Sequence, residues 1–162
     1  MQDLLWFVVH TRPRCEKKLA EYAQKEGIAV TLPTIASVHK YRGKTVKFQK
    51  PLFPGYVFLR MLPTQRPLIY QSDHVANLLD VVDQELLAQQ IEVVMLALES
   101  DVEIRLAPQI VAGQRVRIIA GPLRGVEGVV EQRSGITTVF LRVDFISQAA
   151  AVKMEAHEVE LT

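Results

Sequence analysis

The sequence predicts two folded parts: an α+β N-terminal domain, with an antiparallel-rich sheet and flanking helices, followed by a small all-β barrel. Residues 1–100 mix alternating apolar stretches with stretches that repeat every three or four positions, the periods of strands and helices. Five of the eight glycines fall in residues 113–135, where short apolar runs are separated by turns. We therefore assign residues 1–100 to the first domain, 101–112 to a linker and 113–162 to the second domain.

The N-terminal domain is expected to begin with a strand and a helix. Residues 4–10 form a short apolar run of the kind found in buried strands. Pro13 suits the first turn of a helix, and Gly27 should end that helix. A hairpin should follow over residues 38–48, where Arg42-Gly43-Lys44 separates two runs of β-favouring residues.

The rest of this domain should contain two strands and two helices. Pro54-Gly55 suits the central positions of a type II turn that leads into a strand at residues 56–59. A short helix at residues 68–72, a strand at 75–82 and a longer helix capped by Asp83 should follow. The longer helix has an apolar stripe at helical spacing: Leu87, Ile91, Val94 and Leu98.

The C-terminal domain is predicted to consist of strands. Val116 and Ile118 alternate before a turn at Gly121-Pro122. Further strands are expected at residues 126–130, 139–145, 152–154 and around Val159. Short strands punctuated by glycine fit a small barrel, and each glycine would cost about 1 kcal/mol in the interior of a helix. We therefore expect a β-barrel and not a helical form.

The composition is that of a folded globular protein. Of the 162 residues, 49% are hydrophobic and 23% are charged, which excludes a disordered or collagen-like chain. The apolar run at residues 4–9 is too short to span a bilayer. The single cysteine, Cys15, cannot form an internal disulfide. We therefore expect a cytoplasmic protein that does not associate with membranes.

The net charge of +1 hides an uneven distribution along the chain. Residues 10–60 contain eleven Lys and Arg against three Glu, whereas residues 61–107 contain two basic residues against eight acidic ones. Residues 108–162 contain six of each sign. This segregation indicates a charged binding surface in the N-terminal domain.

Common catalytic and metal-binding patterns are missing from the sequence. The four histidines lack metal-binding spacing, and no serine lies in a G-x-S-x-G turn. Cys15 lies among basic residues at the predicted helix start, a setting that can activate a thiol. Its register with Leu19 nevertheless favours a buried, apolar role. We therefore predict no enzymatic activity, no cofactor and no metal ion, and keep an enzyme that uses Cys15 or a histidine as an alternative.

The predicted hairpin is the strongest local indication of a ligand. Its basic residues are interleaved with Tyr41 and Phe48: Lys40, Arg42, Lys44, Lys47 and Lys50. Such a surface could contact phosphates by charge and bases by stacking. The lysines could equally protect an exposed hairpin from edge-to-edge pairing. These residues alone favour neither interpretation.

Two segments together resemble the NusG family. Residues 51–59, Pro-Leu-Phe-Pro-Gly-Tyr-Val-Phe-Leu, are similar to the K-x-L-F-P-G-Y-V signature of the NusG N-terminal domain, and they follow a basic hairpin as in that family. Residues 113–130 resemble its KOW motif, a strand followed by G-P-x-x-G-x-x-G and a second strand. The resemblance includes Trp6-Phe7-Val8-Val9 and covers nearly the whole chain. The residues that carry the KOW motif are Gly113, Val116, Ile118, Gly121, Pro122, Gly125, Gly128 and Val129.

The resemblance implies a transcription elongation or antitermination factor with an SH3-like KOW barrel. Members of the family dock the N-terminal domain onto the clamp helices of RNA polymerase, and the KOW domain recruits ribosomal protein S10 or termination factor Rho. The residues implied in docking are Phe53, Pro54, Tyr56 and Phe58. Strand alternation puts Tyr56 and Phe58 on one face and Val57 and Leu59 on the other. The resemblance implies that the Tyr56 face is open for docking, while Val57 and Leu59 hold the sheet to a helix. The alternative that residues 56–59 all lie in the core stays open, because aromatic residues are more often buried than exposed.

The resemblance also implies weak contact with the non-template DNA strand. The implied contact residues are Arg12, Arg14, Lys17, Lys18 and His74. Asp73 is a departure from the relatives, because an acid beside His74 argues against reading a DNA sequence. Gln65 and Arg66 lie roughly where specialised relatives touch the gate loop of the polymerase.

The segment between the predicted strand at 75–82 and the following helix lacks the glycine-rich insertion of housekeeping NusG. The chain therefore resembles a specialised paralogue of the RfaH-like antiterminator kind, which we expect to be a monomer. Two alternatives remain: a housekeeping NusG that couples to Rho, and a ribosome-associated KOW protein.

Overall fold

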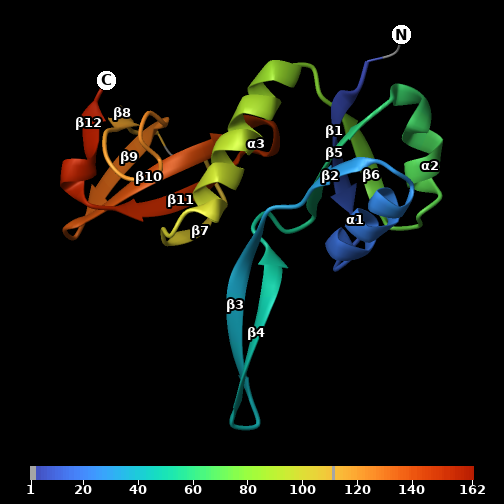
Figure 1. Ribbon diagram of the computed structural model, residues 1–162, viewed down its shortest axis with the longest axis horizontal. Coiled ribbons are helices and arrows are strands. Elements are labelled where there is room, and N and C mark those ends of the chain that lie inside the picture. The colour runs from blue at the N-terminus through green and yellow to red at the C-terminus, as the bar shows by residue number, and fades with distance from the viewer. Residues whose placement is uncertain (1–2, 111) are drawn as a thin grey trace. The chain divides into compact units, whose positions relative to one another are not determined.

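The computed structural model describes residues 3–110 and 112–162, whose helices and strands are shown in Figure 1. The chain divides into two compact units. The first comprises Met1–Thr34 and Gln49–Glu85, and the second comprises Ile35–Phe48 and Leu86–Thr162. The predicted order, mixed α and β elements followed by β structure, is confirmed.

The first unit is built on a four-stranded antiparallel sheet in the order β2-β5-β1-β6. The elements of this part of the chain are β1 (Leu5–Thr11), α1 (Glu16–Lys25), β2 (Ala29–Thr31), β5 (Tyr56–Met61), a 3-10 helix (Pro63–Gln65), α2 (Arg66–Tyr70) and β6 (Val75–Asp80), followed by α3 (Gln84–Glu99). The two central strands, β1 and β5, are the most apolar, as their position between neighbours on both sides requires.

One hydrophobic cluster joins β5 to the first two helices. Val57 and Leu59, alternate residues of β5, are fully buried in it. Leu19 and Ala23 of α1 and Ile69 of α2 belong to the same cluster. The predicted packing of Val57 and Leu59 against a helix is therefore confirmed.

The end of α1 is terminated by glycine, as predicted. Gly27 has a φ of 76° and its N–H donates to the carbonyl of Gln24 at 3.0 Å. The N–H of Ile28 donates to the carbonyl of Ala23 at 2.9 Å. These two hydrogen bonds form a Schellman motif, in which the left-handed residue is usually glycine.

The start of α1 differs from the prediction, because the helix begins at Glu16 and Pro13 lies in the turn before it. Arg14 has a φ of 63°, a left-handed conformation that breaks the helical path and delays the first turn. Cys15 therefore precedes the helix. It is partly exposed, not buried as predicted, and its Sγ lies 3.5 Å from the carbonyl oxygen of Pro13.

The sequence does not predict β2. Its three residues are too few to show a period, and the strand is defined by its pairing with β5, in which Val30 faces Leu59. Tertiary pairing, not local pattern, makes this segment a strand.

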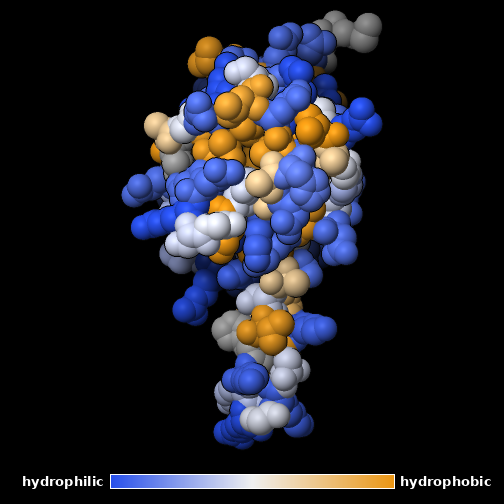
Figure 2. Space-filling model, turned by 90° about the vertical axis from the view of Figure 1, so that its left-hand side faces the viewer, coloured by the Kyte–Doolittle hydropathy of each residue, from blue (hydrophilic) through white to orange (hydrophobic). Residues whose placement is uncertain are grey.

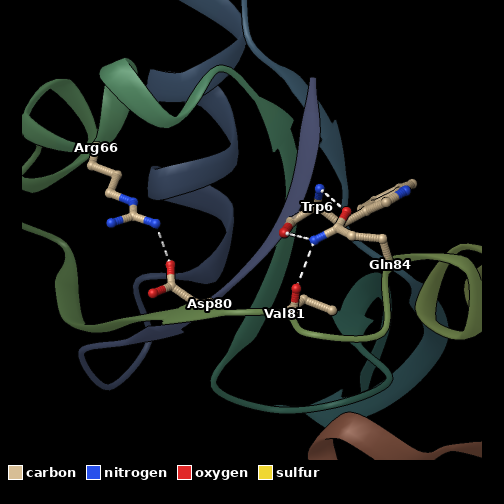
Figure 3. A network of polar contacts seen from close by, with 5 residues as sticks. All are labelled: Trp6, Arg66, Asp80, Val81 and Gln84. Carbon is tan, nitrogen blue, oxygen red and sulfur yellow. Dashed lines mark hydrogen bonds and ion pairs between the residues drawn. The ribbon is translucent and has the colours of Figure 1, made fainter. Parts of the chain in front are cut away.

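The side chain of Gln84, at the start of α3, extends the sheet beyond the end of β6 (Figure 3). The pairing of β6 with β1 ends where Phe7 faces Asp80. At Trp6, the backbone N–H donates to Oε1 of Gln84 at 2.6 Å, and Nε2 of Gln84 donates to the Trp6 carbonyl at 2.9 Å. The same Nε2 donates to the carbonyl of Val81 at 2.9 Å. The amide therefore satisfies backbone groups that would lack a strand partner.

The predicted basic hairpin is confirmed and is longer than expected. β3 (Thr34–Tyr41) and β4 (Lys44–Pro51) form a separate two-stranded sheet. Arg42 and Gly43 have φ values of 49° and 77°, as in the two-residue type I′ turns that join hairpin strands.

The C-terminal strands form a six-stranded antiparallel sheet in the order β12-β8-β9-β10-β11-β7. Their bounds are β7 (Ile104–Ala107), β8 (Gln114–Ile118), β9 (Glu127–Arg133), β10 (Ile136–Val143), β11 (Gln148–Met154) and β12 (Val159–Leu161), with 3-10 helices at Asp144–Ile146 and Ala156–Glu158. The predicted strands after residue 113 correspond to β8 to β12. Val126, the first residue of its predicted strand, lies just before β9, and Asp144 and Phe145 lie in the 3-10 helix after β10 and not in the strand predicted over 139–145.

Part of the predicted linker is a strand. Residues 104–107 form β7, which pairs with β11 so that Ala107 faces Ala149. Ala107, Ala149 and Ala151 pack with Phe140 in a buried cluster. The prediction of a linker was wrong for these residues. Their strand is held by pairing and by the packing of small alanines, so the sequence shows no alternation of apolar residues there.

The glycines of the KOW-like motif have two different roles. Gly121 and Gly125 have φ values of 82° and 92°, which shape the turn between β8 and β9. Gly113 and Gly128 lie where strands approach closely. A Cβ at Gly128 would lie 2.7 Å from Cγ1 of Val139, and one at Gly113 would meet Val129 at 2.8 Å. Of the other motif residues, Val116, Ile118 and Val129 are buried and Pro122 is exposed.

We predict that Gln84→Ala lowers the free energy of unfolding by about 1–3 kcal/mol, because it leaves backbone groups of Trp6 and Val81 without partners. Urea denaturation measures the change. Gln89→Ala, at an exposed position of the same helix, is the control. Equal losses for the two variants would contradict the proposed role of the amide.

We also predict that Gly128→Ala destabilises the C-terminal sheet by about 1–3 kcal/mol, because its Cβ would overlap the side chain of Val139 and the carbonyl of Phe140. Thermal unfolding measures this loss. Arg133→Ala, at the exposed end of the same strand, should change stability little. An unchanged Tm for Gly128→Ala would refute the close approach.

Candidate functional site

The turn that precedes β5 is fixed by hydrogen bonds at Gly55. The N–H of Thr11 donates to the carbonyl of Gly55 at 2.9 Å, and the N–H of Gly55 donates to Oε2 of Glu16 at 3.0 Å. Thr11 is the last residue of β1 and Glu16 the first residue of α1, and both are buried. Gly55 has a φ of 87°, and a Cβ there would lie 3.4 Å from the His10 ring. The left-handed φ favours glycine at this position, whereas a Cβ would make only an ordinary van der Waals contact with the ring.

This turn places Tyr56 beside His10 on the surface. The two ring centroids are 5.3 Å apart and the ring planes are tilted by 32°. His10 and Tyr56 face each other across β1 and β5. Tyr56 is half-buried, whereas His10 and Pro54 are exposed. Pro54 and Tyr56 are the accessible residues of the predicted docking set. Together with His10, which was not in that set, they form what we call the Tyr56 surface.

The prediction that Phe58 lies on an open face is wrong. Phe58 is 0% exposed, and so is Val8, which faces it on β1. Phe53 is 1% exposed. The sheet is therefore buried on both faces at its centre, and this is why apolar residues occupy both faces of β5. The alternative of a core position is confirmed for Val57, Phe58 and Leu59, but not for Tyr56.

The structure brings together part of the predicted DNA-contact set. The N–H of Arg12 donates to the carbonyl of His74 at 2.9 Å, so these two residues are adjacent. The Arg12 guanidinium also pairs with the carboxylate of Asp73 at 3.3 Å, and both side chains are more than half exposed. The acid that departs from the family pattern is therefore a partner of Arg12, which it partly neutralises.

The other predicted DNA-contact residues surround the start of α1. Arg14, Lys17 and Lys18 are exposed. The ammonium of Lys17 donates to the backbone carbonyl of Gln49, at the base of the hairpin. This contact links α1 to β4 and leaves Arg14 and Lys18 as the more available cations of the three.

The two residues predicted to touch the gate loop both make local contacts. The N–H of Leu62 donates to Oε1 of Gln65 at 2.9 Å, which closes the turn before α2. The Arg66 guanidinium pairs with the carboxylate of Asp80, as Figure 3 shows, and lies 5.1 Å from the centre of the Phe7 ring. Arg66 is nevertheless 44% exposed, so its outer edge stays accessible.

The residues that support this site are not predicted by the sequence. Glu16 is only one acid among basic neighbours in the sequence, although in the fold it is 9% exposed and bonded to Gly55. His10 is an isolated histidine in the sequence. A carboxylate in the first turn of a helix is a known stabilising feature, but its partner 39 residues away has no local signal.

Neither a metal centre nor a membrane span is found in residues 3–110 and 112–162. No three His, Cys, Asp or Glu side chains of that range are arranged to hold a metal ion. None of its helices has the length and apolar character needed to cross a bilayer.

Comparison with known proteins identifies the relatives of this chain. The family described as "Transcription termination factor nusG" matches residues 4–95. The protein named transcription termination/antitermination protein NusG from Lactococcus lactis subsp. lactis is 26% identical, over 98% of this chain and 93% of its own length. The protein of the same name from Rickettsia typhi is also 26% identical, over 78% of this chain and 73% of its own length.

A solved structure, the MjSpt4:Spt5 complex in its conformation B, is 20% identical and covers 98% of this chain and 97% of its own, with a TM-score of 0.33. That score is too low to support an argument about the fold. The family match, by contrast, covers more than half of the chain and includes the turn at Gly55 and both central strands. The chain belongs to the NusG family.

Proposed function

We propose that this chain is a transcription elongation or antitermination factor, which binds the clamp of RNA polymerase through the Tyr56 surface and is not an enzyme. The observation that carries the proposal is the position of Tyr56 within the family match, held next to His10 by the bonds of Gly55. The related proteins are named as termination and antitermination proteins, which supports this function.

The geometry of the Tyr56 surface suits protein docking. A half-buried tyrosine offers a large apolar contact and one hydrogen-bonding group, and such residues dominate the affinity of many interfaces. Because Gly55 is fixed by Thr11 and Glu16, the surface is already ordered before binding, which lowers the entropy cost of association. Phe53 and Phe58 support this surface from the core and do not themselves contact the polymerase.

The basic start of α1 is proposed to contact the non-template DNA strand weakly. Arg14 and Lys18 are exposed and can approach phosphates directly. His74 lies next to Arg12 and is partly exposed. We propose that Gln65 and Arg66 contact the gate loop of the polymerase with the parts of their side chains that stay exposed.

The second unit is proposed to act through residues 113–162, as an SH3-like KOW domain that recruits ribosomal protein S10 or Rho. We propose a monomeric, cytoplasmic antiterminator of the RfaH-like kind. The connection between β6 and α3 supports this choice over a housekeeping NusG, because β6 ends at Asp80 and α3 begins at Gln84.

We predict that Tyr56→Ala removes most of the effect of the protein on pausing by a reconstituted elongation complex. Loss of a central interface tyrosine costs about 2 kcal/mol or more, which is roughly a thirtyfold weaker affinity at least. The measurement is pause lifetime as a function of protein concentration. Phe58→Ala is not used, because it would cost about 3–5 kcal/mol of stability at a buried site.

Tyr70→Ala is the matched control for this experiment, since Tyr70 is an exposed tyrosine at the end of α2. It should leave pausing activity unchanged. Full activity of Tyr56→Ala would overturn the docking surface. Stable co-sedimentation with ribosomal subunits, without any binding to polymerase, would favour the ribosomal alternative.

We also predict that Arg14→Gln combined with Lys18→Gln lowers the salt dependence of binding to single-stranded DNA. Each phosphate interaction that is removed should reduce the slope of log affinity against log salt by about 0.7. Fluorescence anisotropy at several salt concentrations gives the slope. Lys25→Gln, at the far end of α1, is the control, and an equal slope for both variants would argue against binding at the helix start.

A further inference from the structure

The hairpin of β3 and β4 exposes a surface that the polymerase and DNA contacts proposed above do not use. Every residue from Lys40 to Lys50 is exposed, and the hairpin pairs with no other described strand. Each of its strands has eight residues and spans about 26 Å. Figure 2 shows apolar groups among the hydrophilic side chains of the hairpin, at the bottom of the view.

The charge of the hairpin has one sign. Residues 34–51 contain no acidic residue and five basic ones: Lys40, Arg42, Lys44, Lys47 and Lys50. A surface with this charge attracts a polyanion.

Three of the hairpin's exposed large apolar residues share one face, and Val38 lies on the other. The two-residue turn sets Tyr41 opposite Lys44, so these two side chains share a face, and strand alternation adds Val46, Phe48 and Lys50 to it. Tyr41 is 65% exposed and Phe48 is 39% exposed. Arg42 lies over the Tyr41 ring, with 5.4 Å from its Cζ to the ring centre. This face therefore combines aromatic rings with cations.

Protection of an exposed edge explains only half of this pattern. Lysines on edge strands prevent pairing with other chains. An exposed row of aromatic and β-branched residues does the opposite, because it invites association. A two-stranded hairpin is also only marginally stable in water by itself. A ligand that covers the Tyr41 face accounts for both the lysines and the aromatics.

We infer that the hairpin binds single-stranded nucleic acid, with bases stacked on Tyr41 and Phe48 and phosphates held by the lysines. The flat faces of bases are accessible only in a single strand, whereas a duplex offers this surface little more than its phosphates. Rings that alternate with cations are the arrangement that such ligands require. This inference rests neither on the Tyr56 surface nor on the DNA contact proposed for Arg14 and Lys18.

The test uses the full chain without polymerase and measures fluorescence anisotropy with oligothymidylate, oligouridylate and a duplex of equal length. The parent protein should bind both single strands more tightly than the duplex. Tyr41→Ala should weaken single-strand binding about tenfold and leave duplex binding unchanged. Tyr41→Phe should retain the affinity, because the stacking ring remains.

A second variant tests the contribution of the lysines to binding and leaves Tyr41 unchanged. Lys44→Gln with Lys50→Gln should reduce the salt slope of single-strand binding by about 0.7 for each phosphate that the variant no longer neutralises. Tyr70→Ala, which removes an exposed ring elsewhere, should have no effect.

Three outcomes would overturn the inference. The first is unchanged single-strand affinity of Tyr41→Ala, and the second is equal or tighter binding of the duplex by the parent. The third is binding to vesicles containing phosphatidylserine without binding to either oligonucleotide, which would assign the hairpin to a lipid surface. None of these results bears on whether Tyr56→Ala loses its effect on pausing, so the two proposals fail separately.

Discussion

The hydrogen bonding of Gly55 is the constraint on which the N-terminal unit depends. Its carbonyl accepts from the end of β1, and its N–H donates to a buried carboxylate at the start of α1. Gly55 thus holds the turn that leads into β5 against both the end of β1 and the start of α1. A carboxyl oxygen that is removed from water costs free energy unless it accepts a hydrogen bond, and at Glu16 the N–H of Gly55 donates one.

The same constraint determines what the site can present. β5 is buried on both faces at Phe58, so of its two aromatic residues Tyr56 alone reaches the surface. At this site the chain therefore presents one tyrosine on a buried apolar support. In the proposed docking, a single side chain placed in this way can carry much of the interface energy.

The sequence predicts most elements because their signals are local. The hairpin, the glycine stop at Gly27 and the strands after residue 113 each follow from period or turn chemistry. β2 and β7 have no such signal, since they are strands only through pairing with β5 and β11. For the site, the sequence indicates Tyr56 but not its supports: Gly55 meets Glu16 across 39 positions, and the burial of Phe58 depends on tertiary packing.

The ion pair between Arg12 and Asp73 has a consequence for the strength of the proposed DNA contact. A cation that neutralises a phosphate normally releases a small ion from the nucleic acid into solution, and that release is the main entropic gain of association. Arg12 already has a counterion of its own, which is covalently part of the protein and cannot diffuse away. In the proposed contact a phosphate would have to displace the carboxylate of Asp73, so the loss of that ion pair would offset part of the attraction. Arg12 would then add less to the affinity than a cation that has no acidic partner.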